Sequence, residues 1–232
     1  MQPVLLACAH GTASPDGQRA VAGLIDAVAG RRPDLEVRAA FVDVQQPTPD
    51  EVLAQLGGRP ARLVPLLLSA GYHVHVDLTR AVAGSGTAFL APALGPDVRL
   101  AVLLHDRLRQ CGLEPSDRVV LAAAGSSEAA AVADCASVAA TLGRLIDRPV
   151  TPTYLSAARP NLSDAVAQLR AAPGRVVVAT YLLAPGFFTT LAARAGADLV
   201  APPLLVPEEP PPAQLVDLVL DRYEEGAGQP AR

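Results

Sequence analysis

The feature that most constrains the fold of this chain is an internal duplication. Matching residues recur at a spacing of 114 or 115 positions, as in the pairs Gly11 and Gly125, Leu68 and Leu183, and Asp106-Arg107 and Asp221-Arg222. A chain of 232 residues is long enough for one large domain or for two domains of about 110 residues. The repeated positions favour two similar domains in tandem.

Within each half, short apolar runs alternate with stretches of helical periodicity. Strands are predicted at 4–9, 37–42 and 62–68, and again at 118–124, 150–155 and 175–183. Alternating strands and helices predict an α/β fold in which each domain is a doubly wound parallel sheet flanked by helices. The expected domains are residues 1–113 and 118–224, joined at 114–117 and followed by a disordered tail at 225–232.

Composition narrows both the core and the function. Half of the residues are hydrophobic but only 3% are aromatic, and Trp is absent, so the core must be built from Ala, Val and Leu. Such residues suit buried parallel strands. The chain has a net charge of -4 and contains no Lys, which excludes a P-loop and a Schiff-base enzyme and disfavours nucleic-acid binding.

The cellular setting is also indicated by the sequence. No apolar run approaches the roughly 20 residues that span a bilayer, so neither a membrane partner nor an anchor is expected. The three cysteines, Cys8, Cys111 and Cys135, are widely spaced and form no C-x-x-C pattern, which argues against disulfides and a zinc knuckle. We therefore expect a cytoplasmic protein.

Two histidines distinguish the first copy from the second. His10 follows the first predicted strand, where the second copy has Ala124, and His73 follows the third, where the second copy has Phe188. Ligands of parallel α/β sheets bind at the carboxyl ends of the strands. A neutral imidazole is a common ligand of divalent metals and can take a proton near neutral pH. The alternative for His10 is a polar strand end bonded to a neighbouring loop.

Two carboxylates are candidates for a supporting role. If 72–82 is helical, Asp77 shares a face with His73 and could fix its tautomer, but it could equally be an ordinary acid near a helix N-terminus. Asp43 ends the second predicted strand and could supply a carboxylate to the same edge of the sheet, or be a surface acid.

Three further residues are weighed and set aside. Cys8 lies two residues before His10, and without a partner cysteine it is interpreted as a small buried hydrophobe. His75 would point away from the His73 face of a helix and is expected to be exposed. His105 lies on a predicted helix at 98–109 and matches Leu220, which indicates a packing position.

Three segments carry a family resemblance, LLACAHGTASPDGQ, AFVDVQQPTPDEV and VPLLLSAGYHVHVDL. In this order and spacing they resemble the sirohydrochlorin chelatases, ATP-independent class II enzymes whose long members carry the same tandem duplication. The resemblance implies a lyase-class chelatase of siroheme or cobalamin synthesis, with His10 and His73 as metal ligands and catalytic residues. Many relatives have Glu at Asp43 and a basic residue at His75, which weakens a catalytic role for either side chain.

The resemblance also implies the substrates. The metal is a substrate, Co²⁺ or Fe²⁺ with Ni²⁺ as a further candidate, and no organic cofactor is expected. A sirohydrochlorin-type tetrapyrrole would bind in a cleft between the halves, and a histidine would accept pyrrole protons. The eight carboxylates of the macrocycle need donors. The candidates are Arg80 and the loops that open helices, with Gly11, Thr12, Ser14, Ser126 and Ser127.

This interpretation includes an expected oligomeric state and leaves two alternative functions open. The duplication replaces a homodimer, so a monomer is expected. A metal or tetrapyrrole carrier without turnover is the alternative from a different functional class. A protoporphyrin ferrochelatase is the alternative enzyme, although four Phe, four Tyr and one Met supply few residues for an apolar pocket.

Overall fold

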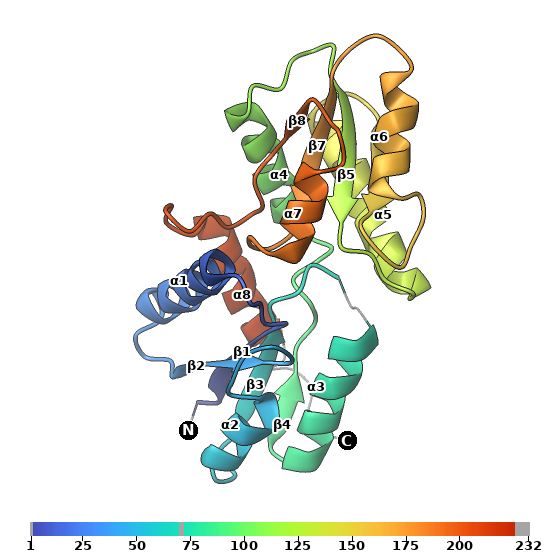
Figure 1. Ribbon diagram of the computed structural model, residues 1–232. Coiled ribbons are helices and arrows are strands. Elements are labelled where there is room, and N and C mark those ends of the chain that lie inside the picture. The colour runs from blue at the N-terminus through green and yellow to red at the C-terminus, as the bar shows by residue number, and fades with distance from the viewer. Residues whose placement is uncertain (1, 70–71, 226–232) are drawn as a thin grey trace. The chain divides into compact units, whose positions relative to one another are not determined.

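The computed structural model describes residues 2–69 and 72–225, and the side chains of 72–75 lie outside this description. The chain divides into two compact units. Unit 1 consists of the residues up to Leu94 together with the segment from Pro207, and unit 2 is Gly95–Val206. Each unit contains a four-stranded, all-parallel sheet, which confirms the predicted α/β class and the two-sheet architecture (Figure 1).

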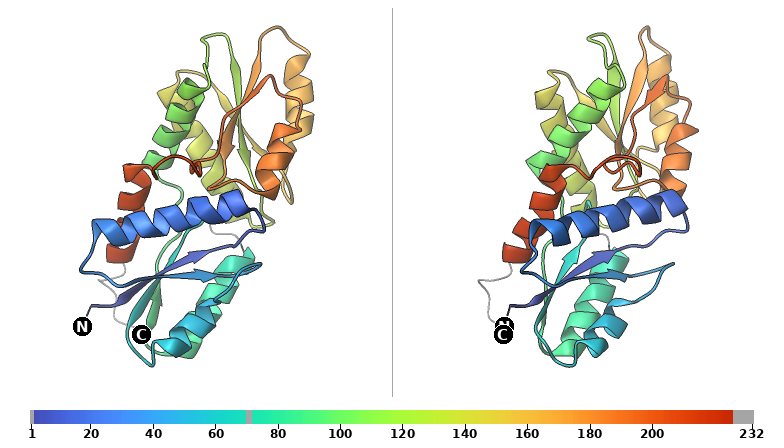
Figure 2. Two further views of the ribbon diagram at one scale, coloured as in Figure 1. Left: turned by 60° about the vertical axis from the view of Figure 1, so that its left-hand side comes forward. Right: turned by 90° about the vertical axis from the view of Figure 1, so that its left-hand side faces the viewer.

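Unit 1 is built on sheet A, whose strand order is β2-β1-β3-β4. One face of the sheet packs against α2 and α3 through an aliphatic cluster that includes Leu6, Cys8 and Leu78. Helices α1 and α8 lie together over the other face (Figure 2). The elements are β1 (Val4–Ala9), α1 (Pro15–Arg31), β2 (Val37–Phe41), α2 (Pro49–Gln55), β3 (Ala61–Pro65), α3 (Tyr72–Ser85), β4 (Ala88–Leu90) and α8 (Ala213–Glu225).

Unit 2 repeats this plan on sheet B, whose strand order is β6-β5-β7-β8. Helices α6 and α7 cover one face through a second aliphatic cluster, and α4 and α5 pack together in the same unit. The elements are α4 (Val98–Gln110), β5 (Arg118–Ala123), α5 (Ala129–Leu145), β6 (Val150–Tyr154), α6 (Leu162–Arg170), β7 (Val176–Tyr181), α7 (Phe187–Ala193) and β8 (Leu199–Val200).

The compact units differ from the predicted domains 1–113 and 118–224, because each copy contributes its last helix to the other unit. Helix α4 comes from the first copy but packs in unit 2, and α8 comes from the second copy but packs in unit 1. The matched arginines fix this arrangement. Arg107 donates to the carbonyl of Leu204 within unit 2 (3.1 Å), and Arg222 donates to the carbonyls of Ala93 (2.8 Å) and Leu94 (3.1 Å) within unit 1.

The local signals of the sequence account for the first helix of unit 1. Ser14 caps α1, because its hydroxyl accepts from the N–H of Gly17 at 3.3 Å, and Pro15 occupies the first turn as predicted. The strands β4 and β8 have only three and two residues, and no pattern in the sequence had indicated them.

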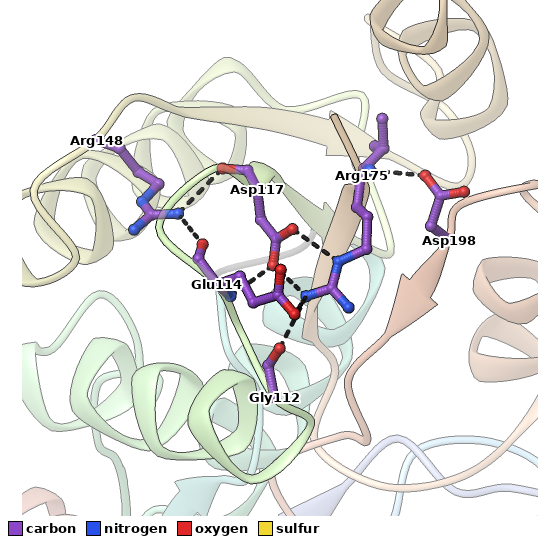
Figure 3. Close-up of polar contacts among 7 residues, drawn as sticks. Gly112, Glu114, Asp117, Arg148, Arg175 and Asp198 are labelled. Carbon is purple, nitrogen blue, oxygen red and sulfur yellow. Dashed lines mark hydrogen bonds and ion pairs between the residues drawn. The ribbon is translucent and has the colours of Figure 1, made fainter. Parts of the chain in front are cut away.

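The segment expected to join the domains is an ordered part of unit 2. Asp117 is 3% exposed, and its carboxylate accepts two hydrogen bonds from the guanidinium of Arg175, both at 2.8 Å. It also accepts from the N–H of Glu114 at 2.7 Å, while Arg148 donates to the carbonyls of Glu114 and Asp117 (Figure 3). The hydrogen bonds from Arg175 hold the pKa of Asp117 below its ordinary value. The chain instead passes between units after Leu94 and after Val206.

Candidate active site

The carboxyl end of β1 is shaped by a glycine that no other residue can replace without distortion. Gly11 has φ +96°, and a Cβ added there would lie 1.9 Å from the carbonyl oxygen of Asp43. The chain can therefore turn sharply after the strand, and the preceding residue, His10, is exposed at the edge of the sheet. This places an imidazole where parallel sheets bind their ligands.

The loop after β2 is hydrogen bonded to the His10 turn. Asp43 donates its backbone N–H to the carbonyl of His10 (2.9 Å), and its carboxylate accepts from the N–H of Val44 (2.8 Å). Gln45 accepts from the N–H of Thr12 through its side-chain oxygen (3.0 Å). Asp43 therefore contacts His10 through its backbone, whereas its carboxylate bonds within its own loop. No pattern in the sequence marks Gln45, and only the tertiary structure gives it a role in holding the loop.

The second predicted ligand, His73, lies in the first turn of α3, which follows β3. In sheet A, β1 lies between β2 and β3, so the strand that precedes α3 is paired with the strand that precedes His10. That the two imidazoles face one crevice stays a prediction. The side chains of His73 and His75 lie outside the described residues, as do residues 70 and 71.

Two predicted residues further along α3 interact with each other. Arg80 donates to the carboxylate of Asp77 at 2.9 Å, and the Arg80 side chain is 71% exposed. An exposed pair of this kind contributes little to stability and exchanges its partners readily. Arg80 is thus accessible to an anionic ligand. Within the described residues, the structure gives the Asp77 carboxylate no partner other than Arg80.

The loop that opens α1 satisfies several of its own polar groups. Thr12 Oγ1 accepts from the N–H of Ser14 at 3.1 Å, and the side chain of Gln18 donates to the carbonyl of Thr12 at 2.8 Å. The N–H of Thr12 is already bonded to Gln45. The sequence suggests that these N–H groups bind substrate carboxylates, but that of Ser14 is bonded within the loop and that of Thr12 is bonded to the loop after β2. Thr12 and Ser14 therefore fix the shape of the turn.

Unit 2 repeats the backbone of this turn without its histidine. Gly125 has φ +98°, and a Cβ there would lie 1.9 Å from the carbonyl oxygen of Ser156. The N–H of Ser156 donates to the carbonyl of Ala124 at 2.9 Å, as Asp43 does to His10. Ser126 accepts from the N–H of Glu128 at 3.1 Å, in the manner of Thr12, while Ser127 is exposed. The backbone of the turn is shared by both copies, and the imidazole belongs to the first.

The residues that were set aside occupy other environments. Cys8 is fully buried in the core between sheet A and its helices, and burial raises the pKa of its thiol far above the ordinary value. This burial fits the small buried hydrophobe that the sequence indicates. His105 is half-buried on α4, in unit 2. No group of three or more His, Cys, Asp or Glu that could hold a metal occurs among the described residues.

Comparison with known proteins reveals similarity over most of the chain. The family model described as CbiX matches residues 4–111 and 118–192. A sirohydrochlorin cobaltochelatase of Methanosarcina barkeri is 28% identical over 122 residues, covering 46% of this chain and 94% of that protein. A sirohydrochlorin ferrochelatase of Bacillus subtilis is 23% identical over 198 residues, covering 80% and 76%.

Two solved structures share the fold. SirB from Bacillus subtilis with Fe³⁺ superimposes with a TM-score of 0.80 at 20% identity, covering 98% of this chain and 96% of that one. The sirohydrochlorin chelatase SirB from Bacillus subtilis subspecies spizizenii in complex with cobalt gives a TM-score of 0.74 at 19% identity, covering 99% of this chain and 97% of that one.

None of the helices in the described part of the chain combines the length and the apolar character that a membrane span needs.

Proposed function

Because the chain belongs to the CbiX family, whose model matches well over half of it, we propose that it inserts a divalent metal into sirohydrochlorin. The two curated relatives are both sirohydrochlorin chelatases, one for cobalt and one for iron. The observation that carries the proposal is the exposed His10 at the carboxyl end of β1, the strand next to the one that α3 and His73 follow. The second copy has the same turn but no histidine in either place.

His10 and His73 are proposed as the metal ligands. Neutral imidazoles would hold the metal while oxygen or water ligands complete its coordination, and the metal would then pass to the pyrrole nitrogens. Two pyrrole protons leave in this exchange, and each of the two imidazoles could accept one of them once its nitrogen has released the metal. The interaction between Asp43 and His10 is through the backbone, so we assign Asp43 the role of positioning the His10 turn.

The macrocycle carboxylates need cationic or N–H donors, and Arg80 is the strongest of the predicted candidates. Its side chain is exposed and its bond to Asp77 is easily exchanged. Gly11, Thr12 and Ser14 are proposed to maintain the turn at His10. Ser126 and Ser127 remain candidates for carboxylate contacts from unit 2, where Ser127 is exposed.

We infer that the enzyme accepts Co²⁺ and Fe²⁺, with Ni²⁺ as a further candidate. Relatives are named for cobalt and for iron, and SirB structures are described with Fe³⁺ and with cobalt. Imidazole ligands suit several first-row metals, so availability is expected to decide the physiological one. The proposed location is the cytoplasm, and a monomer is the proposed state because the two copies replace two subunits.

The test is an anaerobic assay in which the wild-type protein is mixed with sirohydrochlorin and either Co²⁺ or Fe²⁺. A chelatase accelerates the absorbance change of the macrocycle, whereas a carrier would leave it at the uncatalysed rate. His10→Ala and His73→Ala should each remove most of the activity. His105→Ala on α4 is the matched control, and His75→Ala should also retain activity. Protoporphyrin in place of sirohydrochlorin tests the alternative enzyme.

A further inference from the structure

Two large aliphatic side chains that are exposed among the described residues of unit 1 lie in the loop after β2 and near the start of α3. Among the described residues of unit 1, Val44 and Val76 are the exposed large hydrophobic ones, with exposed fractions of 59% and 41%. Val44 follows β2, and Val76 lies one turn after the start of α3. Because β1 lies between β2 and β3, these valines come from the elements on either side of His10.

The backbone conformation of Val44 is unusual for a valine. Val44 has φ +64°, in the left-handed region that β-branched residues rarely adopt. The conformation is held by the N–H of Gln45, which donates to the carbonyl of Asp43 at 2.6 Å, and by the bond from Val44 N–H to the Asp43 carboxylate. A Gly or Asn would fit this conformation with less strain.

The second copy has the same backbone turn with a different side chain. Ala157 occupies the equivalent position with φ +54°, and Ala158 donates to the carbonyl of Ser156 at 2.6 Å. The turn therefore belongs to both copies, but only the first copy has a valine there. A side chain that is 59% exposed gains little from packing, so packing does not explain why a strained valine occupies this position.

We propose that Val44 and Val76 form an apolar rim on either side of His10 that contacts the ring face of the tetrapyrrole. This inference rests on the proposed function. The macrocycle has carboxylates at its periphery and an apolar ring face, and apolar contacts favour binding of that face by removing it from water. A chain with 3% aromatic residues and no Trp supplies these contacts with aliphatic side chains.

The test measures metal insertion, Co²⁺ binding without macrocycle, and Tm for four variants. Val44→Asn relieves the backbone strain but removes the apolar contact, and Val44→Leu is not β-branched but stays apolar. Val76→Thr keeps the shape of valine and adds a hydroxyl. Leu145→Asn is the control, because Leu145 is 41% exposed at the C-terminal end of α5 in unit 2.

Val44→Asn is expected to raise KM for sirohydrochlorin about three- to tenfold while kcat changes less than twofold. Its Tm should rise by about 2–4 °C because the strain is relieved. Val76→Thr should raise KM without a change in Tm, whereas Val44→Leu and Leu145→Asn should keep the wild-type KM. Co²⁺ affinity should be unchanged in all four variants.

Three results would overturn the rim. The first is an unchanged KM in Val44→Asn and Val76→Thr, and the second is a rise in KM in Val44→Leu as large as that in Val44→Asn. The third is a weakened Co²⁺ affinity in Val44→Asn or Val76→Thr, which would mean that the substitution acts through His10. Failure of the wild-type protein to insert metal would be a different result, because it would reject the proposed function itself.

Discussion

Replacing Gly11 by Ala tests whether the turn after β1 positions the proposed metal ligand. The left-handed conformation costs an alanine about 1–2 kcal/mol. The added Cβ would lie 1.9 Å from the carbonyl oxygen of Asp43, so the loop after β2 must retreat by more than 1 Å. Overpacking of this kind costs about 1–3 kcal/mol. The free energy of unfolding should therefore fall by about 2–5 kcal/mol.

Gly125→Ala is the matched control, because its φ of +98° and its 1.9 Å contact with Ser156 are nearly the same. Both variants should lose similar stability, measured by urea unfolding followed by circular dichroism. Only Gly11→Ala moves the His10 turn, because the loop that must retreat is bonded to the carbonyl of His10. At a temperature where both variants are folded, Co²⁺ affinity and kcat should fall in Gly11→Ala and persist in Gly125→Ala.

The reasoning would be refuted if Gly11→Ala retained wild-type Co²⁺ affinity and kcat despite its loss of stability. Equal losses of Co²⁺ affinity in both variants would also contradict it, since the turn in unit 2 has no histidine to misplace. A Gly11→Ala protein as stable as the wild type would show that the loop after β2 yields without cost.

Other predictions concern stability and reactivity. Asp117→Asn should lower the free energy of unfolding by about 1.5–3 kcal/mol at pH 7, since it weakens the hydrogen bonds that the buried carboxylate accepts from the partly exposed guanidinium of Arg175. The folded state lowers the pKa of Asp117, so this stabilisation is fully present above a pH of about 4 and is lost as the pH falls through the pKa of the folded state. The difference in unfolding free energy between wild type and variant, measured by urea unfolding, should therefore shrink in acid. Arg222→Met should cost about 2–3 kcal/mol by removing two bonds to carbonyls, measured as a lower urea midpoint. Cys8 should react with a thiol reagent only as the protein unfolds, because burial raises its pKa; rapid labelling in the native state, monitored by mass spectrometry, would contradict this.

The sequence was sufficient to predict the class of fold, and it selected the candidate metal ligands that remain to be tested. Alternating apolar runs predicted the parallel strands, because strands buried on both faces are continuously apolar. The duplication directed attention to His10 and His73, because each is replaced in the second copy. The capping residue Ser14 and the following Pro15 marked the start of α1 correctly, since these signals are local.

The pairing of helices with sheets could not be read from the repeat. The amphipathic faces of α4 and α8 suit either sheet, because the two copies have similar sequences and similar sheets. Only the packing of the chain decides that each helix covers the sheet of the other copy. The predicted domain limits therefore differ from the compact units, although the match of Asp106-Arg107 with Asp221-Arg222 was already visible in the sequence.

The details of the His10 turn were likewise decided by tertiary structure. The sequence contains Gly11, but its need for glycine arises from the carbonyl of Asp43, 32 residues away along the chain. The bond from Thr12 to Gln45 has no local signature, because it depends on two loops meeting at the edge of a sheet. The left-handed backbone of Val44 is held within its own loop, but a β-branched residue gives no sign of it in the sequence. Sequence thus identified which residue types differ between the copies, and the fold determined how their backbones are held.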